Sequence, residues 1–226
     1  MSIEDSLEQD FHPSKVPDER PGPEGGRRHT NRLARTRTLV EAALRCFLTL
    51  GLDAVTIDDV TKEAGVAKGS FYRYFDNKED LIATLFRPTA EAVEAAMTRA
   101  SESLESAADE PALEAAYALL ATDLALVLFS NEDAVRLFLQ ERHGPATVGR
   151  APIRALDERV LALALRITQA GRRSGLLRPV DPEVSASAVV GAVMQLLWIQ
   201  LVQAPPSDPI SRARELIDIV LHGVRA

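Results

Sequence analysis

The chain has 226 residues, of which 46% are hydrophobic and 26% charged, and it carries a formal net charge of −7 at pH 7. These values are ordinary for a soluble protein with a proper core, arranged as one domain or as two small ones. The single cysteine, Cys46, excludes an internal disulfide and a metal site made of several cysteines, and it fits a reducing cytoplasm.

The charge is unevenly distributed along the chain. Residues 1–26 hold two basic and seven acidic side chains, residues 27–80 hold ten and eight, and residues 81–226 hold 14 and 18. Only the middle section is net positive, which is compatible with nucleic-acid contact there despite the overall acidity. The first section is rich in Pro and Gly and has no periodicity, so we expect a disordered acidic tail without the pattern of a signal peptide.

Five arginines begin the middle section: Arg27, Arg28, Arg32, Arg35 and Arg37. As an arm in front of DNA-binding helices, such a run would follow phosphates or reach into a minor groove. The alternative is a solvated helix start that only keeps the protein soluble. From about residue 31 to 50, apolar residues recur at steps of three and four, which predicts an amphipathic helix that ends at Gly51.

Residues 55–81 have the pattern of two short helices joined by a tight turn and followed by a third helix. Thr56 is placed to cap the first of them in a T-x-x-D capping box with Asp59. Gly65 is able to take the positive φ that ends this helix. The next turn combines small, polar and cationic residues with anchoring aromatics, a combination that suits a helix in the major groove.

These residues resemble the DNA-binding domain of the tetracycline-repressor (TetR) family of bacterial regulators. The resemblance covers roughly 50 residues at fixed spacing, which is more informative than a lone short motif. The matching features are Thr56, the Ala64-Gly65-Val66 step, Gly69-Ser70-Phe71-Tyr72, Phe75, Lys78-Glu79 and Leu81. The family implies an all-α fold, in which an N-terminal three-helix helix-turn-helix domain precedes a C-terminal helical domain for ligand binding and dimerisation.

The resemblance also implies roles for individual residues. Thr56, Tyr72 and Lys78 would contact backbone phosphates, with Arg35 in the basic arm before them. The bases or flanking phosphates would face Lys68, Gly69, Ser70 and Arg73. Plainer interpretations stay open: Thr56 only caps its helix, Tyr72 packs on the three-helix core, Lys78 is solvated, and Arg73 serves a phosphate.

One residue departs from the family pattern. The position before Lys68 usually carries a polar N-cap, and here it is Ala67. The missing acceptor should cost the recognition helix roughly 1 kcal/mol. We therefore expect this helix to fray in the free protein and to become firm on DNA.

The remaining chain is helical in pattern and has no strand-like alternation, which predicts an all-α protein. Asn77 is placed to cap a helix that continues into the C-terminal part, and Pro88 predicts a kink or break near residues 85–87. Such a kink would either transmit motion or be passive shape. Further helices are expected at about residues 112–129, 132–141 and 153–174.

Residues 184–207 carry no charge over a length that would span a membrane. Their glutamines and their closing prolines favour instead a helix buried between subunits of a soluble protein, with Asp181-Pro182 as its cap and first turn. A last helix follows Asp208-Pro209. These two apolar helices predict a homodimer through the last two helices, matched to a palindromic DNA operator.

The sequence contains no motif of an enzyme, a cofactor site or a metal site. We expect a small-molecule pocket among the helices between residues 86 and 198, although such residues are more often plain core. The candidate lining residues are Phe86, Met97, Tyr117, Phe129, Phe138, His143, Met194, Gln195 and Trp198.

The sequence thus predicts a cytoplasmic, dimeric, ligand-responsive regulator of transcription, a repressor released from double-stranded DNA by a hydrophobic or amphipathic effector. Its expected parts are the tail 1–26, the helix-turn-helix domain 27–80 and the effector and dimerisation domain 81–226. The alternative is an architectural or cell-division factor of the same fold that binds DNA without an effector. An all-α enzyme is disfavoured because no catalytic constellation is present.

Overall fold

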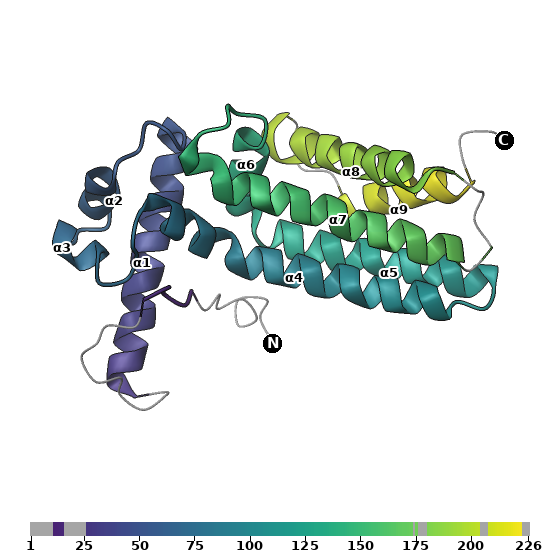
Figure 1. Ribbon diagram of the computed structural model, residues 1–226, viewed down its shortest axis with the longest axis horizontal. Coiled ribbons are helices and arrows are strands. Elements are labelled where there is room, and N and C mark those ends of the chain that lie inside the picture. The colour runs from purple at the N-terminus through teal and green to yellow at the C-terminus, as the bar shows by residue number, and fades with distance from the viewer. Residues whose placement is uncertain (1–10, 16–25, 174, 176–179, 204–207, 223–226) are drawn as a thin grey trace. The chain divides into compact units, whose positions relative to one another are not determined.

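The computed structural model describes residues 11–15, 26–173, 175, 180–203 and 208–222, and within them every regular element is a helix. The elements are α1 (Arg27–Leu50), α2 (Ile57–Glu63), α3 (Lys68–Phe71), α4 (Lys78–Ser106), α5 (Glu110–Phe129), α6 (Glu132–Glu141), the 3₁₀ helix η2 (Val148–Arg150), α7 (Ala151–Arg173), α8 (Pro182–Trp198), the π-helix η3 (Ile199–Gln203) and α9 (Pro209–His222) (Figure 1). The predicted all-α fold, a helix-turn-helix followed by a helical C-terminal part, is confirmed.

The chain forms two compact units. The first unit comprises Met1–Pro88 with Asp133–Ala155, and the second comprises Thr89–Glu132 with Leu156–Ala226. The helix-turn-helix therefore shares its unit with α6 and η2, which follow it in the sequence by more than 40 residues. Helix α4 continues unbroken through Pro88, the last residue that it contributes to the first unit, so the expected break is absent.

Aromatic and branched apolar residues fill the core of the first unit. Phe47 from α1 and Phe71 from α3 are each at most 1% exposed, and Phe75 is fully buried beside Phe71 with ring centroids 5.4 Å apart. Helix α2 packs on α1 and on α3 (Figure 1). Gly51 ends α1 at a φ of 80°, and its N–H donates to the carbonyl of Phe47 at 2.8 Å, as the predicted terminator should.

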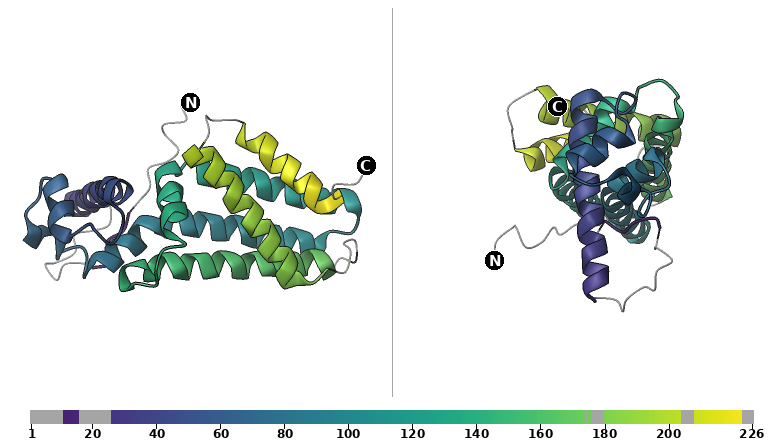
Figure 2. Two further views of the ribbon diagram at one scale, coloured as in Figure 1. Left: turned by 90° about the horizontal axis from the view of Figure 1, so that it is seen from above. Right: turned by 90° about the vertical axis from the view of Figure 1, so that its left-hand side faces the viewer.

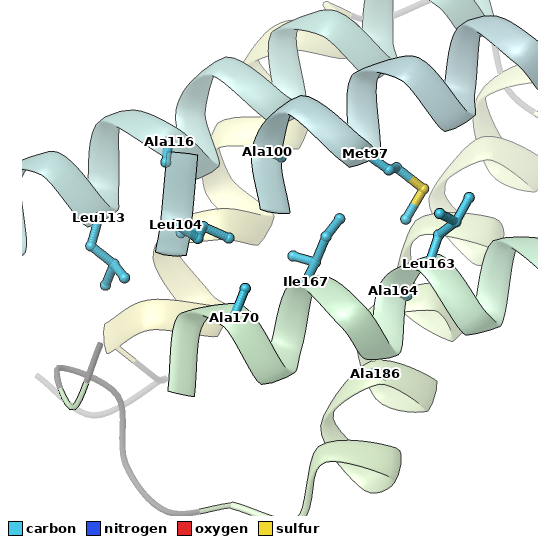
Figure 3. Close-up of a cluster of buried hydrophobic side chains, with 10 residues drawn as sticks. All are labelled: Met97, Ala100, Leu104, Leu113, Ala116, Leu163, Ala164, Ile167, Ala170 and Ala186. Carbon is cyan, nitrogen blue, oxygen red and sulfur yellow. The ribbon is translucent and has the colours of Figure 1, made fainter. Parts of the chain in front are cut away.

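The second unit is a bundle built on many small side chains. Figure 3 shows Met97 and Leu104 of α4 directed toward Leu163 and Ile167 of α7. The core cluster includes Ala100, Ala116, Ala164, Ala170 and Ala186. Alanines let helix backbones approach closely, so the bundle packs with few large side chains.

Surface ion pairs show how the helices of this bundle run. Arg159 of α7 pairs with Glu94 of α4, and Arg173 pairs with Glu105, so α7 follows α4 in the same direction (Figure 2). Helix α9 packs on α5. Exposed pairs of this kind contribute little stability, and the apolar cluster beneath them holds the bundle.

Two helices are long and apolar enough to cross a membrane, by length and composition alone: Glu110–Phe129 and Pro182–Val202. Only 17% of each window is buried within the described chain. Asp181 caps α8 as predicted, since its carboxylate accepts from the N–H groups of Glu183 and Val184 at 2.9 and 3.0 Å. Core helices of soluble proteins pass the same test, and these two leave apolar surface uncovered on a single chain.

Candidate nucleic-acid interface

The first helix of the helix-turn-helix begins with the predicted capping box. Thr56 accepts from the N–H of Asp59 at 3.2 Å, and Asp59 accepts from the N–H of Thr56 at 2.9 Å. The Thr56 hydroxyl also donates to the Asp59 carboxylate at 2.6 Å. The two hydrogen bonds that this carboxylate accepts, from the hydroxyl and from the backbone N–H of Thr56, keep the pKa of Asp59 below its usual range. The cap role of Thr56 is therefore present in the free protein, with its side chain exposed.

The turn between the two helices depends on a glycine. Gly65 has a φ of +66°, a conformation that side chains with a Cβ rarely adopt. The next residue, Val66, donates its N–H to the carbonyl of Thr61 at 2.9 Å and turns the chain back toward the core. The turn thus places α3 against α2.

Helix α3, the predicted recognition helix, is short and starts without a side-chain cap. It spans Lys68–Phe71, and its N-cap is Ala67 in an extended conformation, which has no side-chain hydrogen bond. This confirms the N-cap position predicted for Ala67. The helix is held from behind because Phe71 is fully buried.

The front of α3 and the turn after it is open to solvent. Lys68, Gly69, Tyr72 and Arg73 are exposed, and Ser70 is half-buried. A Cβ added at Gly69 would meet nothing within 4 Å, and the residue does not have a positive φ. The fold therefore does not require glycine at this position, whereas a partner backbone that approaches α3 closely would.

Lys68 is held by an acidic neighbour in the free protein. Its ammonium lies 2.8 Å from a carboxylate oxygen of Asp58 on α2, and both side chains are exposed. The hydrogen bond and charge of Asp58 raise the pKa of Lys68. A DNA contact through Lys68 would compete with this ion pair or share the ammonium with it.

Tyr72 lies half in the core and half in solvent. Its ring packs edge-on against Phe71 with centroids 5.4 Å apart, while 46% of the residue stays exposed. The two interpretations of Tyr72 are thus compatible, since one side of the ring anchors α3 and the remainder is available to a partner.

Lys78 supports the loop between α1 and α2. Its ammonium donates to the carbonyls of Leu52 at 2.8 Å and Val55 at 3.0 Å, so the interpretation of Lys78 as simply solvated is wrong. An ammonium has three N–H donors, which leaves one for a phosphate. Asn77 caps α4 as predicted, because its side chain accepts from the N–H of Asp80 at 2.8 Å.

The arginine run is helical rather than an extended arm. All five arginines lie in α1, which begins at Arg27 instead of near residue 31, and Arg35 is exposed. Figure 1 shows these first turns of α1 extending past α2 and α3. Arginine has a high helix propensity, so the run continues the helix toward its N-terminus.

Part of the predicted disordered tail contacts the helix-turn-helix. Ser14 donates to the carboxylate of Asp80, and Lys15 pairs with Asp76 and donates its N–H to the carbonyl of Tyr74. Within the predicted tail, polar groups of Ser14 and Lys15 therefore have partners in the turn before α4. Residues 1–10 and 16–25 lie outside the described residues.

The predicted effector residues are divided between the two units. Phe86, Phe138 and His143 belong to the first unit, where the two phenylalanine rings pack edge-on at 6.4 Å and His143 is exposed in the loop after α6. The other six belong to the second unit: Met97, Tyr117, Phe129, Met194, Gln195 and Trp198. Among them, Met97 is part of the apolar cluster, and burial raises the pKa of Tyr117.

The sequence did not predict a buried polar contact in the first unit. Glu141, the last residue of α6, accepts from the backbone N–H of Leu52 at 3.0 Å and pairs with Arg150 at 2.6 Å. The sequence did carry a signal for it. Glu141 follows Leu137 by four positions and Phe138 by three, which places it on the buried face of the amphipathic helix α6.

Over the described ranges, no group of three His, Cys, Asp or Glu side chains is arranged to hold a metal.

A capped helix, a glycine turn and a short helix with an open cationic front define a helix-turn-helix DNA-binding protein. The profile of the tetR family of bacterial regulatory proteins matches residues 39–85, which include α2, α3 and the start of α4. The uncharacterized HTH-type transcriptional regulator YhgD of Bacillus subtilis is 26% identical over 194 residues, which cover 85% of this chain and 97% of that protein.

Solved structures have the same fold. A putative fatty acid metabolism regulator of Clostridium perfringens superposes with a TM-score of 0.70 at 20% identity, over 84% of this chain and 99% of that one. FadR of Bacillus subtilis, solved in complex with stearoyl-CoA, superposes with a TM-score of 0.64 at 20% identity over the same shares. The family profile and the relatives named as transcriptional regulators support a DNA-binding regulator of transcription.

The missing cap at Ala67 leads to a first prediction. We expect Ala67→Ser to stabilise the protein by about 1 kcal/mol, because the serine hydroxyl would accept from a free N–H at the start of α3. Thermal denaturation should show a rise in Tm of about 2–4 °C. Ala54→Ser, the same change at an exposed loop residue that is not an N-cap, should leave Tm unchanged; an equal response of the two variants would contradict the assignment.

The open front at Gly69 leads to a second prediction. We expect Gly69→Ala to keep or raise the free energy of unfolding, by up to about 1 kcal/mol, because alanine favours helix and its Cβ meets nothing. Affinity for specific DNA, measured by fluorescence anisotropy, should fall at least about tenfold because the methyl group blocks close approach. Gly65→Ala should instead lower the free energy of unfolding, because a residue with a Cβ is strained at a φ of +66°. Unaltered DNA affinity in Gly69→Ala would remove Gly69 from the interface.

Proposed function

We propose that the chain is a dimeric repressor of transcription that leaves a palindromic operator when a hydrophobic or amphipathic small molecule binds. The observation that carries the proposal is the exposed, partly cationic front of α3, mounted on a buried aromatic anchor and next to a capped α2. Lys68, Gly69, Ser70 and Arg73 are the proposed base-side contacts, and Arg35, Thr56, Tyr72 and Lys78 the proposed phosphate contacts.

The proposed dimer forms through α8 and α9. Both helices leave large apolar side chains in solvent on a single chain: Val184 is 63% exposed and Ile219 is 49% exposed. Covering such surface is the main driving force for subunit association. A two-fold dimer would present two α3 helices to two half-sites about one turn of DNA apart.

The proposed effector is amphipathic, and long-chain acyl-CoA is the first compound to test. The support is chemical: the core of the second unit consists of apolar and small side chains, and the half-buried Tyr117 packs against it with a hydroxyl whose pKa is raised by burial. FadR of Bacillus subtilis, which shares the fold, was solved in complex with stearoyl-CoA. A ligand of this kind would favour a dimer whose α3 helices are wrongly spaced for the operator.

DNA binding provides the third prediction. Anisotropy with the DNA upstream of the chain's own coding region should show affinity that falls steeply with salt. Lys68→Ala should weaken binding about 5- to 100-fold, because a base-edge or phosphate contact is lost. Arg99→Ala is the matched control: Arg99 is an exposed cation paired at 2.7 Å with Asp123 in the second unit, and its loss should leave the affinity unaltered.

The same assay separates the proposal from its rivals. Stearoyl-CoA added to the preformed complex should release the DNA, whereas free CoA at equal concentration should not. Release by neither compound, nor by fatty acids and steroids, would favour the architectural factor that needs no effector. Binding that is insensitive to salt, or equal losses in Lys68→Ala and Arg99→Ala, would contradict α3 as the DNA-contacting element.

A further inference from the structure

We propose that Arg150 is a positioning residue for DNA binding. Together with Glu141 and Asp53 it forms an ion-pair cluster, here called the Arg150 clamp, that holds the loop between α1 and α2. The loop leads directly into Thr56 and the capped start of α2. This role rests on the proposed function, because it concerns how well the helix-turn-helix is held for DNA.

The buried part of the clamp is Glu141. One carboxylate oxygen accepts from the backbone N–H of Leu52 at 3.0 Å, and the other accepts from Nε and Nη2 of Arg150 at 2.9 and 2.6 Å. The Glu141 side chain is only 9% exposed. A carboxylate in such a place requires partners, and here it has a loop amide and a guanidinium.

The exposed part of the clamp is Asp53, which lies in the loop itself. Nη1 of Arg150 pairs with its carboxylate, and the Thr147 hydroxyl donates to the same carboxylate at 3.2 Å. The hydrogen bond from Arg150 keeps the pKa of Asp53 below its usual range. One planar guanidinium thus bridges a buried and an exposed carboxylate, a geometry that the single ammonium of lysine does not reproduce.

The loop is held from its other side by Lys78. Leu52 donates its N–H to Glu141 and accepts on its carbonyl from Lys78 at 2.8 Å, so both polar groups of its backbone are fixed by side chains. Lys78 also reaches the carbonyl of Val55 at 3.0 Å. The residue immediately before Thr56 is therefore tied to the first turn of α4, and the loop cannot shift without breaking one of these contacts.

Gly144 makes room for the clamp, because a Cβ at this position would overlap the guanidinium of Arg150. A Cβ at Gly51 would lie 3.4 Å from a carboxylate oxygen of Glu141, which is an ordinary contact distance. Gly51 also takes the positive φ that turns the chain from α1 into the loop. A side chain at position 144 would therefore displace the guanidinium of Arg150 from its place in the clamp.

The sequence position of the clamp gives it a route to the rest of the protein. Residues 133–155 carry Glu141 and Arg150 within the first unit, and the chain on both sides of this segment belongs to the second unit. The clamp is therefore attached covalently to the second unit at two points, in addition to the path through α4. A change in the second unit that shifts α6 or η2 would reach the α1–α2 loop through Arg150.

Two conservative variants test the proposal, the fourth prediction. Asp53→Asn removes the exposed ionic partner. Arg150→Lys keeps the positive charge but replaces the planar guanidinium, whose several N–H groups reach both carboxylates, by a single ammonium. We expect both variants to lower the affinity for the DNA that the wild type binds by about three- to tenfold, at a temperature where circular dichroism shows them folded. Amide exchange at Leu52 should accelerate in Arg150→Lys, since its acceptor Glu141 is no longer held.

Val40→Ala is the control for stability alone. Val40 lies on α1, is not a clamp residue and is buried in the core of the first unit, so the substitution should lower Tm by several degrees. A positioning role predicts that this variant keeps its DNA affinity at the same temperature while the two clamp variants lose theirs. Losses that simply follow Tm across all three would overturn the proposal.

The remaining outcomes separate the clamp from the proposed function. Normal DNA affinity in both clamp variants, with wild type binding as expected, would overturn the positioning role and leave the proposed function intact. Unaltered exchange at Leu52 in Arg150→Lys would also overturn it, without any DNA present. Failure of wild type to bind DNA at all would overturn the proposed function, and the positioning role with it.

Discussion

Burial of Phe71 is the interaction on which the DNA-binding unit depends. Helix α3 has only four residues and no side-chain cap, and an isolated helix of this length is not stable in water. Its single fully buried side chain packs against Phe75 and Tyr72 and fixes the orientation of its exposed front. Stability and the proposed recognition are thus divided between the two faces of one helical turn, so substitutions on the front are expected to alter DNA affinity with little effect on folding.

Three cationic side chains of the first unit are held in intramolecular contacts in the free protein. Lys68 pairs with Asp58, Lys78 binds two loop carbonyls, and Arg150 bridges two carboxylates. The exposed pair of Lys68 is weak and easily exchanged for a DNA contact, whereas the contacts of Lys78 and Arg150 fix the backbone around the start of α2. The acidic surroundings therefore order the interface without preventing contact with a polyanion, even in a chain with a net charge of −7.

Local patterns predicted the features that depend on neighbouring residues. The Thr56 and Asp181 caps, the Gly51 and Gly65 terminators and the uncapped start at Ala67 all follow from residues within one helical turn. The Arg150 clamp was missed because Asp53 and Arg150 are 97 positions apart, and no periodic pattern reports such a contact. Two further features also depend on tertiary context: α4 continues through Pro88 without the break that the proline allowed for, and residues 11–15 find polar partners near Asp80.

Amide hydrogen exchange of α3 with and without operator DNA tests the account most directly. If the uncapped helix is the DNA-contacting element, the amides of residues 68–71 should exchange rapidly in the free protein and become strongly protected in the complex. The amides of α1 around Phe47, which lie in the buried core, should be protected in both states. Protection on DNA confined to other helices, with α3 unaltered, would contradict the central claim.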